Sequence, residues 1–208
     1  MRQATKGLLL VVSGPAGVGK GTVTGGVMKR HPEIKMSVSV TTRAPRPNEI
    51  EGVHYFFRTP EEFQKMIDEG AFLEYMHVFG MNYYGTPRKY VEEQLALGNH
   101  VILEIDVQGA HKVKEAFPDA IRVFIAPPSV EELRNRLNNR GTETPEQIER
   151  RLAEADAELK DMSNCDYVIV NIERETAISQ MEAIVEAERC SVHHNQAVIE
   201  AFLGGMES

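Results

Sequence analysis

Residues 8–20 read Leu8-Leu9-Leu10-Val11-Val12-Ser13-Gly14-Pro15-Ala16-Gly17-Val18-Gly19-Lys20, and they establish the framework for the rest of the chain. The continuous apolar run predicts a buried strand, and the glycine-rich turn after it opens a helix. Glycines let successive backbone N–H groups face a phosphate, and the helix N-terminus adds partial positive charge. Lys20 would supply a mobile charge for the β- and γ-phosphates. We therefore predict that residues 14–22 bind a nucleoside triphosphate. The alternative, a glycine-rich turn with a solvated lysine, explains less, because strand, spacing and helix all agree.

One position departs from the usual phosphate-loop pattern. The lysine is usually followed by Ser or Thr, whose hydroxyl ligates Mg²⁺, but here it is followed by Gly21 and then Thr22. Ligation by a hydroxyl at residue 21 is therefore lost. Magnesium would be held by phosphates and water, with Thr22 or a distant carboxylate as the candidate protein ligand.

Apolar runs and helical patterns alternate along most of the chain, which is typical of an α/β fold with a central parallel sheet flanked by helices. Four runs are predicted as strands of that sheet: residues 8–13, 100–106, 121–126 and 167–171. Apolar residues at spacings of four and three predict amphipathic helices. One face would carry Ile148, Leu152, Ala155, Leu159 and Met162, and another would begin with Ile178, Met181 and Val185.

Two stretches break this rhythm. Residues 37–84 contain short β-rich pieces at 53–57 and 72–78 around a helix near 61–68, which indicates an inserted β-rich subdomain. Residues 138–145 are polar and are bracketed by arginines, which indicates a mobile loop or lid.

Composition bounds the class of protein. The chain has 208 residues, 42% hydrophobic and 26% charged, which is typical of one globular domain with small inserted subdomains. The net charge of −8 argues against nucleic acid as a partner. The apolar run at residues 7–12 is too short to span a bilayer and lacks the pattern of a cleaved signal. We expect a soluble cytoplasmic protein with no membrane partner, in which Cys165 and Cys190 are reduced.

A second anion site is suggested by residues 37–46, which read Ser-Val-Ser-Val-Thr-Thr-Arg-Ala-Pro-Arg. Period-two alternation would place Ser37, Ser39 and Thr41 on one face of a strand. Arg43 and Arg46 follow in a proline-stiffened turn. Two guanidinium groups suit a phosphate monoester because they give paired donors, although such a pair taken alone is more often solvated surface.

Two carboxylates lie near the predicted end of a buried strand. Glu104 and Asp106 alternate with apolar residues, so both would leave the same face of that strand. Ligands in open α/β sheets bind at the carboxyl ends of the strands. The alternative is an exposed acidic strand end without a ligand.

Five segments together closely resemble the guanylate kinase family, and they occur in the same order. They are the phosphate loop, Thr41-Thr42-Arg43-Ala44-Pro45-Arg46, Gly52-Val53-His54-Tyr55-Phe56-Phe57, Asn82-Tyr83-Tyr84-Gly85-Thr86 and Ile105-Asp106-Val107-Gln108-Gly109. The resemblance covers nearly the whole chain. It implies a P-loop kinase core at about residues 1–36, 87–135 and 163–208, a GMP-binding insertion at about 37–86 and a lid at about 136–162. The implied reaction is ATP-dependent phosphorylation of GMP to GDP in purine nucleotide metabolism, with Mg²⁺ as cofactor and dGMP as a further acceptor.

The resemblance also implies roles for individual residues of the GMP site. Those that look like the clamp on the GMP phosphate are Arg43, Arg46, Tyr55 and Tyr84, with Gly85 next to the clamp. Those that look like guanine readers are Ser39, Glu74 and Thr86. Guanine presents N1–H and N2–H donors beside the O6 acceptor, so a carboxylate accepts from both nitrogens while a hydroxyl donates to oxygen. From position alone, Glu74 would be a solvated strand residue.

Further roles are implied near the transferred phosphoryl group. Asp106 would lie close to the GMP base and the magnesium region. Glu104, which stands where many relatives carry Asp, is also expected in the GMP site. Arg140 and Arg151 match the family's phosphate-contacting arginines and would act with Lys20 in catalysis, whereas surface salt bridges are their alternative role. Asn171 resembles the residue near the adenine of ATP.

Three questions stay open on the residues alone. Met81 looks like one extra residue before the Asn82-Tyr83-Tyr84 run and could shift the loop register, although Tyr84 is expected in the clamp. The rival functions are another nucleoside monophosphate kinase, such as one for adenylate, and a noncatalytic peptide-binding module of the guanylate kinase type. Neither a monomer nor a homo-oligomer is favoured.

Overall fold

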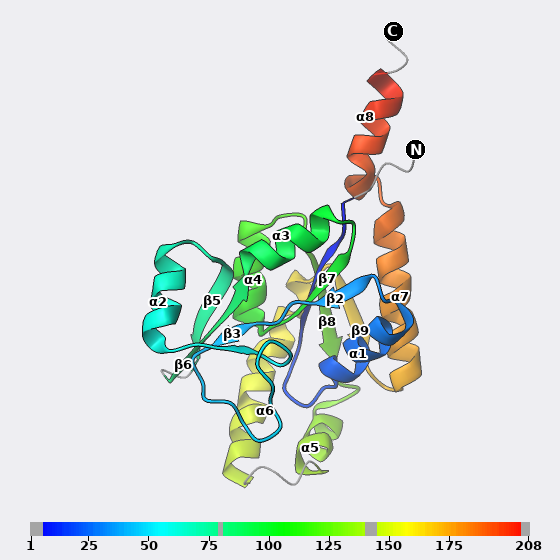
Figure 1. Ribbon diagram of the computed structural model, residues 1–208. Helices are drawn as coiled ribbons and strands as arrows, with labels where there is room; N and C mark the ends of the chain where they lie inside the picture. Colours follow the sequence, from blue (N-terminus) through cyan, green and yellow to red (C-terminus); the bar gives the residue numbers. More distant parts are fainter. Residues whose placement is uncertain (1–5, 79–80, 140–144, 205–208) are drawn as a thin grey trace.

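A five-stranded parallel sheet forms the centre of the computed structural model, which describes residues 6–78, 81–139 and 145–204 (Figure 1). All four neighbouring strand pairs of this sheet are parallel. Its strands, in spatial order, are β2 (Ile34–Met36), β7 (His100–Glu104), β1 (Leu9–Ser13), β8 (Ile121–Ala126) and β9 (Tyr167–Val170).

Alternate residues at the start of the chain serve the two faces of this sheet. Leu10 and Val12 pack with helices α1 (Lys20–Arg30) and α7 (Arg174–Cys190), while Leu9 and Val11 pack with α3 (Arg88–Ala96) and α4 (Val107–Ala116). All four side chains are at most 2% exposed. Burying each of them contributes roughly 1.5–3 kcal/mol to stability. The α/β core with helices on both faces is therefore confirmed (Figure 1).

The four predicted core strands are all present, and a fifth one, β2, was not predicted. β2 has only three residues, too few for a period to be recognised. The prediction for residues 100–106 was wrong at its end, because β7 stops at Glu104 and the chain turns into α4. Asp106 is the N-cap of α4, and its carboxylate accepts a hydrogen bond from Gly109 N at 2.7 Å.

The inserted sheet has four strands, in the order β4 (Phe56–Phe57), β3 (Val40–Thr41), β6 (Asn82–Pro87) and β5 (Phe72–Val78). Helix α2 (Pro60–Asp68) covers it, and Phe63 of α2 stacks on Phe72 with ring centroids 4.4 Å apart. This group lies beside the parallel sheet (Figure 1). The expected subdomain is β-rich as predicted, but two of its predicted strands are shorter.

Tertiary contacts explain the first correction and a local turn explains the second. Residues 37–41 do not form one alternating strand, because Ser37 N bonds to Ile102 O of the core sheet and only Val40–Thr41 joins the inserted sheet. The predicted strand at 53–57 is reduced to Phe56–Phe57, because residues 52–54 form a turn. The first stretch passes from the core sheet to the inserted sheet and the second begins with a turn, and local alternation carries no information about either change.

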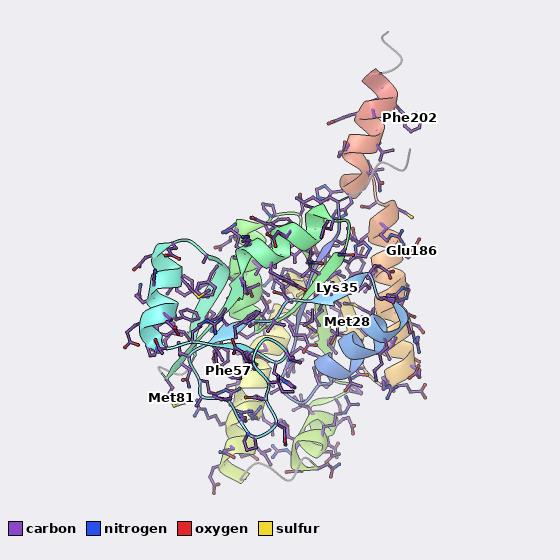
Figure 2. All side chains as sticks on the ribbon, viewed as in Figure 1. Met28, Lys35, Phe57, Met81, Glu186 and Phe202 are labelled. Atoms are coloured by element: carbon purple, nitrogen blue, oxygen red, sulfur yellow. The ribbon has the colours of Figure 1, made fainter. Side chains whose placement is uncertain are left out.

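Strand pairing next to the extra residue Met81 is continuous, and the one register shift in the β5–β6 pairing lies between Phe72 and Glu74 at the far end. His77 pairs with Tyr83, and the pairing continues through Met76 with Tyr84. Met81 lies just beyond the last pair, Val78 with Asn82, at the turn end of the hairpin, and is 71% exposed (Figure 2). The insertion is therefore taken up outside the paired residues.

Helices α5 (Val130–Asn139) and α6 (Pro145–Lys160) pack against each other below the sheet in the view of Figure 1. Their contact is a small apolar cluster in which Leu133 and Leu137 of α5 meet three of the residues predicted for the apolar face of α6. Those three are Ile148, Leu152 and Ala155. A short 3₁₀ helix, η1 (Asp161–Asn164), then leads α6 back to β9.

The C-terminal part contains a 3₁₀ turn, η2 (His193–Asn195), and α8 (Gln196–Gly204), which projects away from the sheet with Phe202 73% exposed (Figures 1 and 2). Cys165 and Cys190 are both free. Within the described ranges, none of the helices combines the length and apolarity that a bilayer span requires.

Candidate active site

The phosphate loop has the strand–turn–helix context that its sequence predicts, since β1 ends at Ser13 and α1 begins at Lys20. Glycine is required at several positions in it, of which Gly14 and Gly19 are the clearest. At Gly14 (φ 136°) a Cβ would lie 2.2 Å from the Ile125 carbonyl oxygen, and at Gly19 (φ 98°) it would lie 2.6 Å from the Asn171 amide nitrogen. Side chains at either position would displace a neighbour and strain the backbone, so the loop can form only with glycines.

Lys20 curls back over the loop. Its Nζ donates hydrogen bonds to the Gly14 carbonyl at 2.5 Å and to the Pro15 carbonyl at 3.2 Å. The loop N–H groups, the N-terminus of α1 and this ammonium therefore combine positive charge in one place, which suits a polyphosphate.

Two side chains from other elements fasten the loop. Asn171, buried at the end of β9, donates from Nδ2 to the Val18 carbonyl at 2.8 Å. Arg136 of α5 donates to the same carbonyl at 3.3 Å and to the Asn171 carbonyl at 3.0 Å. Arg136 was not among the predicted site residues, because its pairing with Glu132 at i,i+4 is typical of any helix surface.

A cleft of about 440 Å³ lies between the inserted sheet and the carboxyl end of β7. It brings together nearly all the residues predicted for the second substrate. Its lining includes Ser39, Arg43, Arg46, Tyr55, Glu74, Tyr84, Gly85, Glu104 and Asp106. Thr86 lies behind this wall, bonded to Glu74.

Arg43 is held from several sides at one end of the cleft. Its guanidinium donates to Glu49 at 2.9 Å, to the Tyr84 hydroxyl at 3.3 Å and to the Ala44 carbonyl at 2.7 Å. It also lies 5.4 Å from the centre of the Tyr55 ring. A guanidinium has five N–H donors, so these contacts orient Arg43 and leave one N–H on each terminal nitrogen for a bidentate anion.

Glu49 contacts two predicted site residues, Arg43 and Arg46, but was not itself predicted. One carboxylate oxygen accepts from Arg43, and the other accepts from the Arg46 backbone N at 2.7 Å. The hydrogen bond from Arg43 is the main reason that the pKa of Glu49 falls to about 2. Glu49 stays ionised and keeps both arginines on one turn. The Pro-rich spacing between the arginines and Glu49 was the only available signal.

Glu74 lies at the other end of the cleft, deep in the wall. It is 7% exposed, and Thr86 opposite it on β6 donates a hydrogen bond to Oε1 at 2.8 Å. Burial raises the pKa of Glu74 to about 6, partly offset by the Thr86 bond. A Cβ at Gly109 would come within 3.3 Å of Oε2, so this glycine lets the N-terminus of α4 approach the carboxylate.

The two neighbouring tyrosines of β6 face opposite sides of the sheet. Tyr84 packs edge-on against Tyr55, with ring centroids 5.9 Å apart, and meets Arg43 in the cleft. Tyr83 stacks instead on Phe63 under α2. Gly85 is needed for packing, because a Cβ there would lie 2.7 Å from the Phe72 ring.

Glu104 and Asp106 take different positions, contrary to the expectation that both leave one strand face. Glu104 ends β7 and accepts a hydrogen bond from the buried Thr24 hydroxyl of α1. Its two oxygens would be 3.6 and 3.7 Å from a Cβ at Gly21. Asp106, exposed, caps α4 nearer to Glu74. Glu104 lies beside the phosphate loop, and Asp106 lies beside the Glu74 end of the cleft.

Of the two arginines predicted for a lid, Arg151 is half-buried on α6, and Arg140 lies outside the described residues. Glu158, seven residues after Arg151 on the same helix, was not predicted. Burial raises the pKa of Glu158, and the nearby charge of Lys20 offsets only part of this rise. The spacing of seven, two turns of one helix face, was the signal that could have found it. Thr22 is exposed.

The model of the family described as "Guanylate kinase" matches residues 6–188. A guanylate kinase from Symbiobacterium thermophilum is 50% identical over 204 residues, covering 98% of this chain and 96% of that protein. One from Caldanaerobacter subterraneus subsp. tengcongensis is 48% identical over 191 residues, 92% of each chain. Among solved structures, guanylate kinase from Anaplasma phagocytophilum is similar with a TM-score of 0.76 and 36% identity, covering 94% of this chain and 95% of that one.

Proposed function

Since the chain belongs to the guanylate kinase family, we propose that it transfers the γ-phosphoryl group of ATP to GMP, giving ADP and GDP. The observation that carries the proposal is the pairing of two unlike anion sites. A phosphate loop adjoins a cleft with a held guanidinium, Arg43, at one end and a buried carboxylate, Glu74, at the other. A nucleoside monophosphate has a phosphate at one end, which suits the guanidinium, and a base at the other. Guanine suits the carboxylate because it offers two N–H donors.

We assign the GMP phosphate to the Arg43 end. Arg43 offers two remaining N–H groups, Arg46 and Tyr55 line the same end, and Tyr84 both lines it and holds Arg43. A phosphate monoester is largely dianionic at neutral pH, so GMP needs no general base to become a nucleophile. The protein's work is to orient the attacking oxygen and to stabilise charge.

We assign the guanine base to the Glu74 end. Ionised Glu74 would accept from N1–H and N2–H. Thr86 has one hydroxyl proton and donates it to Glu74, so Ser39, which also lines the cleft, is the assigned donor to guanine O6. None of the assigned side chains addresses the ribose 2′-hydroxyl, and we therefore propose dGMP as a second acceptor.

ATP is assigned to the phosphate loop, residues 14–22, with its adenine near Asn171. On binding, Lys20 would exchange the Gly14 and Pro15 carbonyls for phosphate oxygens. Arg140 and Arg151 of the lid, residues 136–162, would meet the transferring group when the lid closes and excludes water. We assign the rest of the chain to two parts, the kinase core and the GMP-binding insertion at residues 37–86.

The residues around the loop fit a magnesium ion. Magnesium binds through one or two carboxylates, substrate phosphates and water, and the open position at Gly21 faces the Glu104 carboxylate. Thr22 and Asp106 are the other candidate ligands. A magnesium ion held by these residues would supply positive charge that neutralises the charge developing on the transferred phosphoryl group.

The test is a panel of GMP, dGMP, IMP and AMP as acceptors with MgATP. We expect GMP to be preferred and AMP to be the poorest acceptor. Preference for AMP would instead favour an adenylate-type kinase. Absence of transfer to every acceptor, with peptide binding retained, would favour the noncatalytic module.

Arg151→Ala is expected to lower kcat more than it changes the KM for GMP, because this arginine would contact the phosphoryl group chiefly in the closed transition state. Arg150→Ala is the matched control, since Arg150 is exposed on the same helix and pairs with Glu154 on the surface. Steady-state kinetics of both variants make the comparison. A change confined to the GMP KM would place Arg151 in the monophosphate clamp.

GMP binding is expected to weaken in acid through Glu74. Its pKa of about 6 lies above the usual Glu value, so lowering the pH protonates it, and a protonated carboxyl cannot accept from both guanine donors. The phosphate of GMP also titrates at about pH 6, and this affects both proteins alike. We therefore use the GMP dissociation constant of Glu74→Gln divided by that of wild type, in which the phosphate effect cancels. Calorimetry between about pH 8 and about pH 5 should show this ratio shrinking as the pH falls. A ratio independent of pH would exclude Glu74 titration from GMP binding.

A further inference from the structure

A buried polar cluster joins the end of α6 to the core. Its members are Arg122 of β8, His111 of α4 and Asp161, the first residue after α6. Arg122 is 3% exposed and Asp161 is 8% exposed, whereas His111 is partly open to solvent. The cleft that we assign to GMP is lined by other residues. Contact with GMP therefore does not account for the cluster.

Arg122 holds the 3₁₀ helix η1 at two points. Its Nη2 donates a hydrogen bond to Asp161 Oδ2 at 2.6 Å, and its Nη1 donates to the Asn164 carbonyl at 3.0 Å. Asn164 in turn donates from Nδ2 to Asp161 Oδ1 at 2.7 Å. A planar guanidinium that uses two of its nitrogens fixes direction as well as distance. These bonds therefore set how η1 lies on β8.

His111 completes the cluster from α4. Its Nε2 lies 2.7 Å from Asp161 Oδ1, and its Nδ1 faces Arg122 Nη1 at 3.5 Å. Because a guanidinium can only donate, we assign Nδ1 as the acceptor and Nε2–H as the donor to Asp161. Burial raises the pKa of Asp161, but the hydrogen bonds from Asn164 and His111 and the charge of Arg122 outweigh burial, so this pKa lies below its usual value. Asp161 is an ionised carboxylate with three donors.

The place of this cluster on α6 gives it leverage over Arg151. The apolar face of α6 packs on α5, and the cluster holds the end of α6 that returns to the core. Arg151 precedes Asp161 by ten residues, which is about 15 Å along a helix axis. A change of about 10° in the direction of α6 at Asp161 would therefore move Arg151 by about 3 Å. Even about 1 Å of misplacement can slow a reaction about a hundredfold.

We propose that Arg122 and Asp161 are positioning residues, which fix the C-terminal end of α6 so that this helix presents Arg151 to the transferred phosphoryl group. The proposal rests on the proposed function and deepens it. Stability alone explains the pair less well, because an apolar pair of similar volume is often as stable as a buried ion pair. Arg122 Nε adds to the cost, since it is buried without a hydrogen-bond partner among the described residues.

The test removes both charges and keeps most of the volume. The double variant Arg122→Met/Asp161→Leu should fold and melt within a few degrees of wild type, because no buried charge is left unpaired. Phosphoryl transfer from MgATP to GMP in a single turnover, followed by rapid quench, should slow about 10- to 100-fold. The dissociation constants of GMP and of a nonhydrolysable ATP analogue should stay within about twofold of wild type, since the misplaced group acts chiefly in the transition state.

Two further variants show whether the double variant acts through Arg151. Arg151→Ala added to Arg122→Met/Asp161→Leu should slow transfer much less than it does in wild type, because both changes would remove the same contact. Lys160→Met/Asp156→Leu is the matched control. It makes the same kind of change in an ion pair near the end of α6 whose side chains are 75% and 72% exposed, and it should leave the transfer rate unchanged.

Arg122→Lys keeps the charge but loses the fork that reaches two acceptors, so it should fold and still slow transfer. A wild-type rate in the folded double variant, or a full additional loss from Arg151→Ala, would overturn the positioning role while leaving GMP kinase activity intact. Failure of both Arg122→Lys and the double variant to fold would also overturn it, because the cluster would then serve the fold alone. Failure of the wild-type protein to phosphorylate GMP would instead overturn the proposed function.

Discussion

We expect Lys20→Ala to lower kcat about a hundredfold to a thousandfold, the range found when one group that stabilises transition-state charge is removed. Lys20 is the first residue of α1, and its ammonium bonds to the carbonyls of Gly14 and Pro15. Those bonds close the loop over itself, and a polyphosphate would take their place. Alanine cannot supply the charge, although it keeps the helix start.

The matched control is Lys29→Ala, because Lys29 is exposed in the last turn of the same helix. Thermal melting of both variants separates misfolding from catalytic loss, and both should melt within a few degrees of wild type. Near-normal turnover by a folded Lys20→Ala protein would refute the assignment of the phosphate loop.

Glu74→Gln should cost roughly 2–4 kcal/mol in kcat/KM for GMP, a factor of about 30 to about 1,000. The amide keeps the size of the side chain and can still accept from Thr86, but its NH₂ group would face the guanine donors. The site is buried, so the clash leaves donors without partners. ATP binding at the phosphate loop should hardly change.

An acceptor series makes this prediction specific for guanine. IMP retains N1–H and O6 but lacks the N2 amino donor, whereas AMP has an unprotonated N1. Wild type should rank GMP well above IMP, with AMP lowest, and Glu74→Gln should narrow the gap between GMP and IMP. Glu115→Gln, outside the cleft, should keep the wild-type order. Equal GMP activity in Glu74→Gln and wild type would refute the guanine-reading role.

The residue pattern of short segments was enough to predict the core of the fold. Residues 8–20 predict strand, turn and helix together, because burial on both sheet faces requires a continuous apolar run and a tight turn requires glycine. The same holds for the helix faces that contain Ile148 and Met181, since a helix with a period of 3.6 must bury its apolar stripe. The α/β fold was therefore predictable from short segments.

Candidate site residues were identified less directly. Taken alone, Glu74 and the arginines of residues 43–46 were ordinary surface types, and only the combined motifs of a family connected them. The roles given to these residues remain predictions, although the structure gathers them in one cleft. Arg140 remains a prediction outside the described residues.

Contacts between segments far apart in sequence became known only from the tertiary structure. Glu49 had no recognisable role until its carboxylate met Arg43, and Asn171 and Arg136 were seen to hold Val18 only when β9 and α5 came together. Glu104 and Gly21 are 83 residues apart in number and became one feature through the pairing of β7 with β1. Residue types and spacing set which elements form, because those preferences are local, whereas pKa values, hydrogen-bond partners and the side that a carboxylate faces depend on burial and on neighbours that packing supplies.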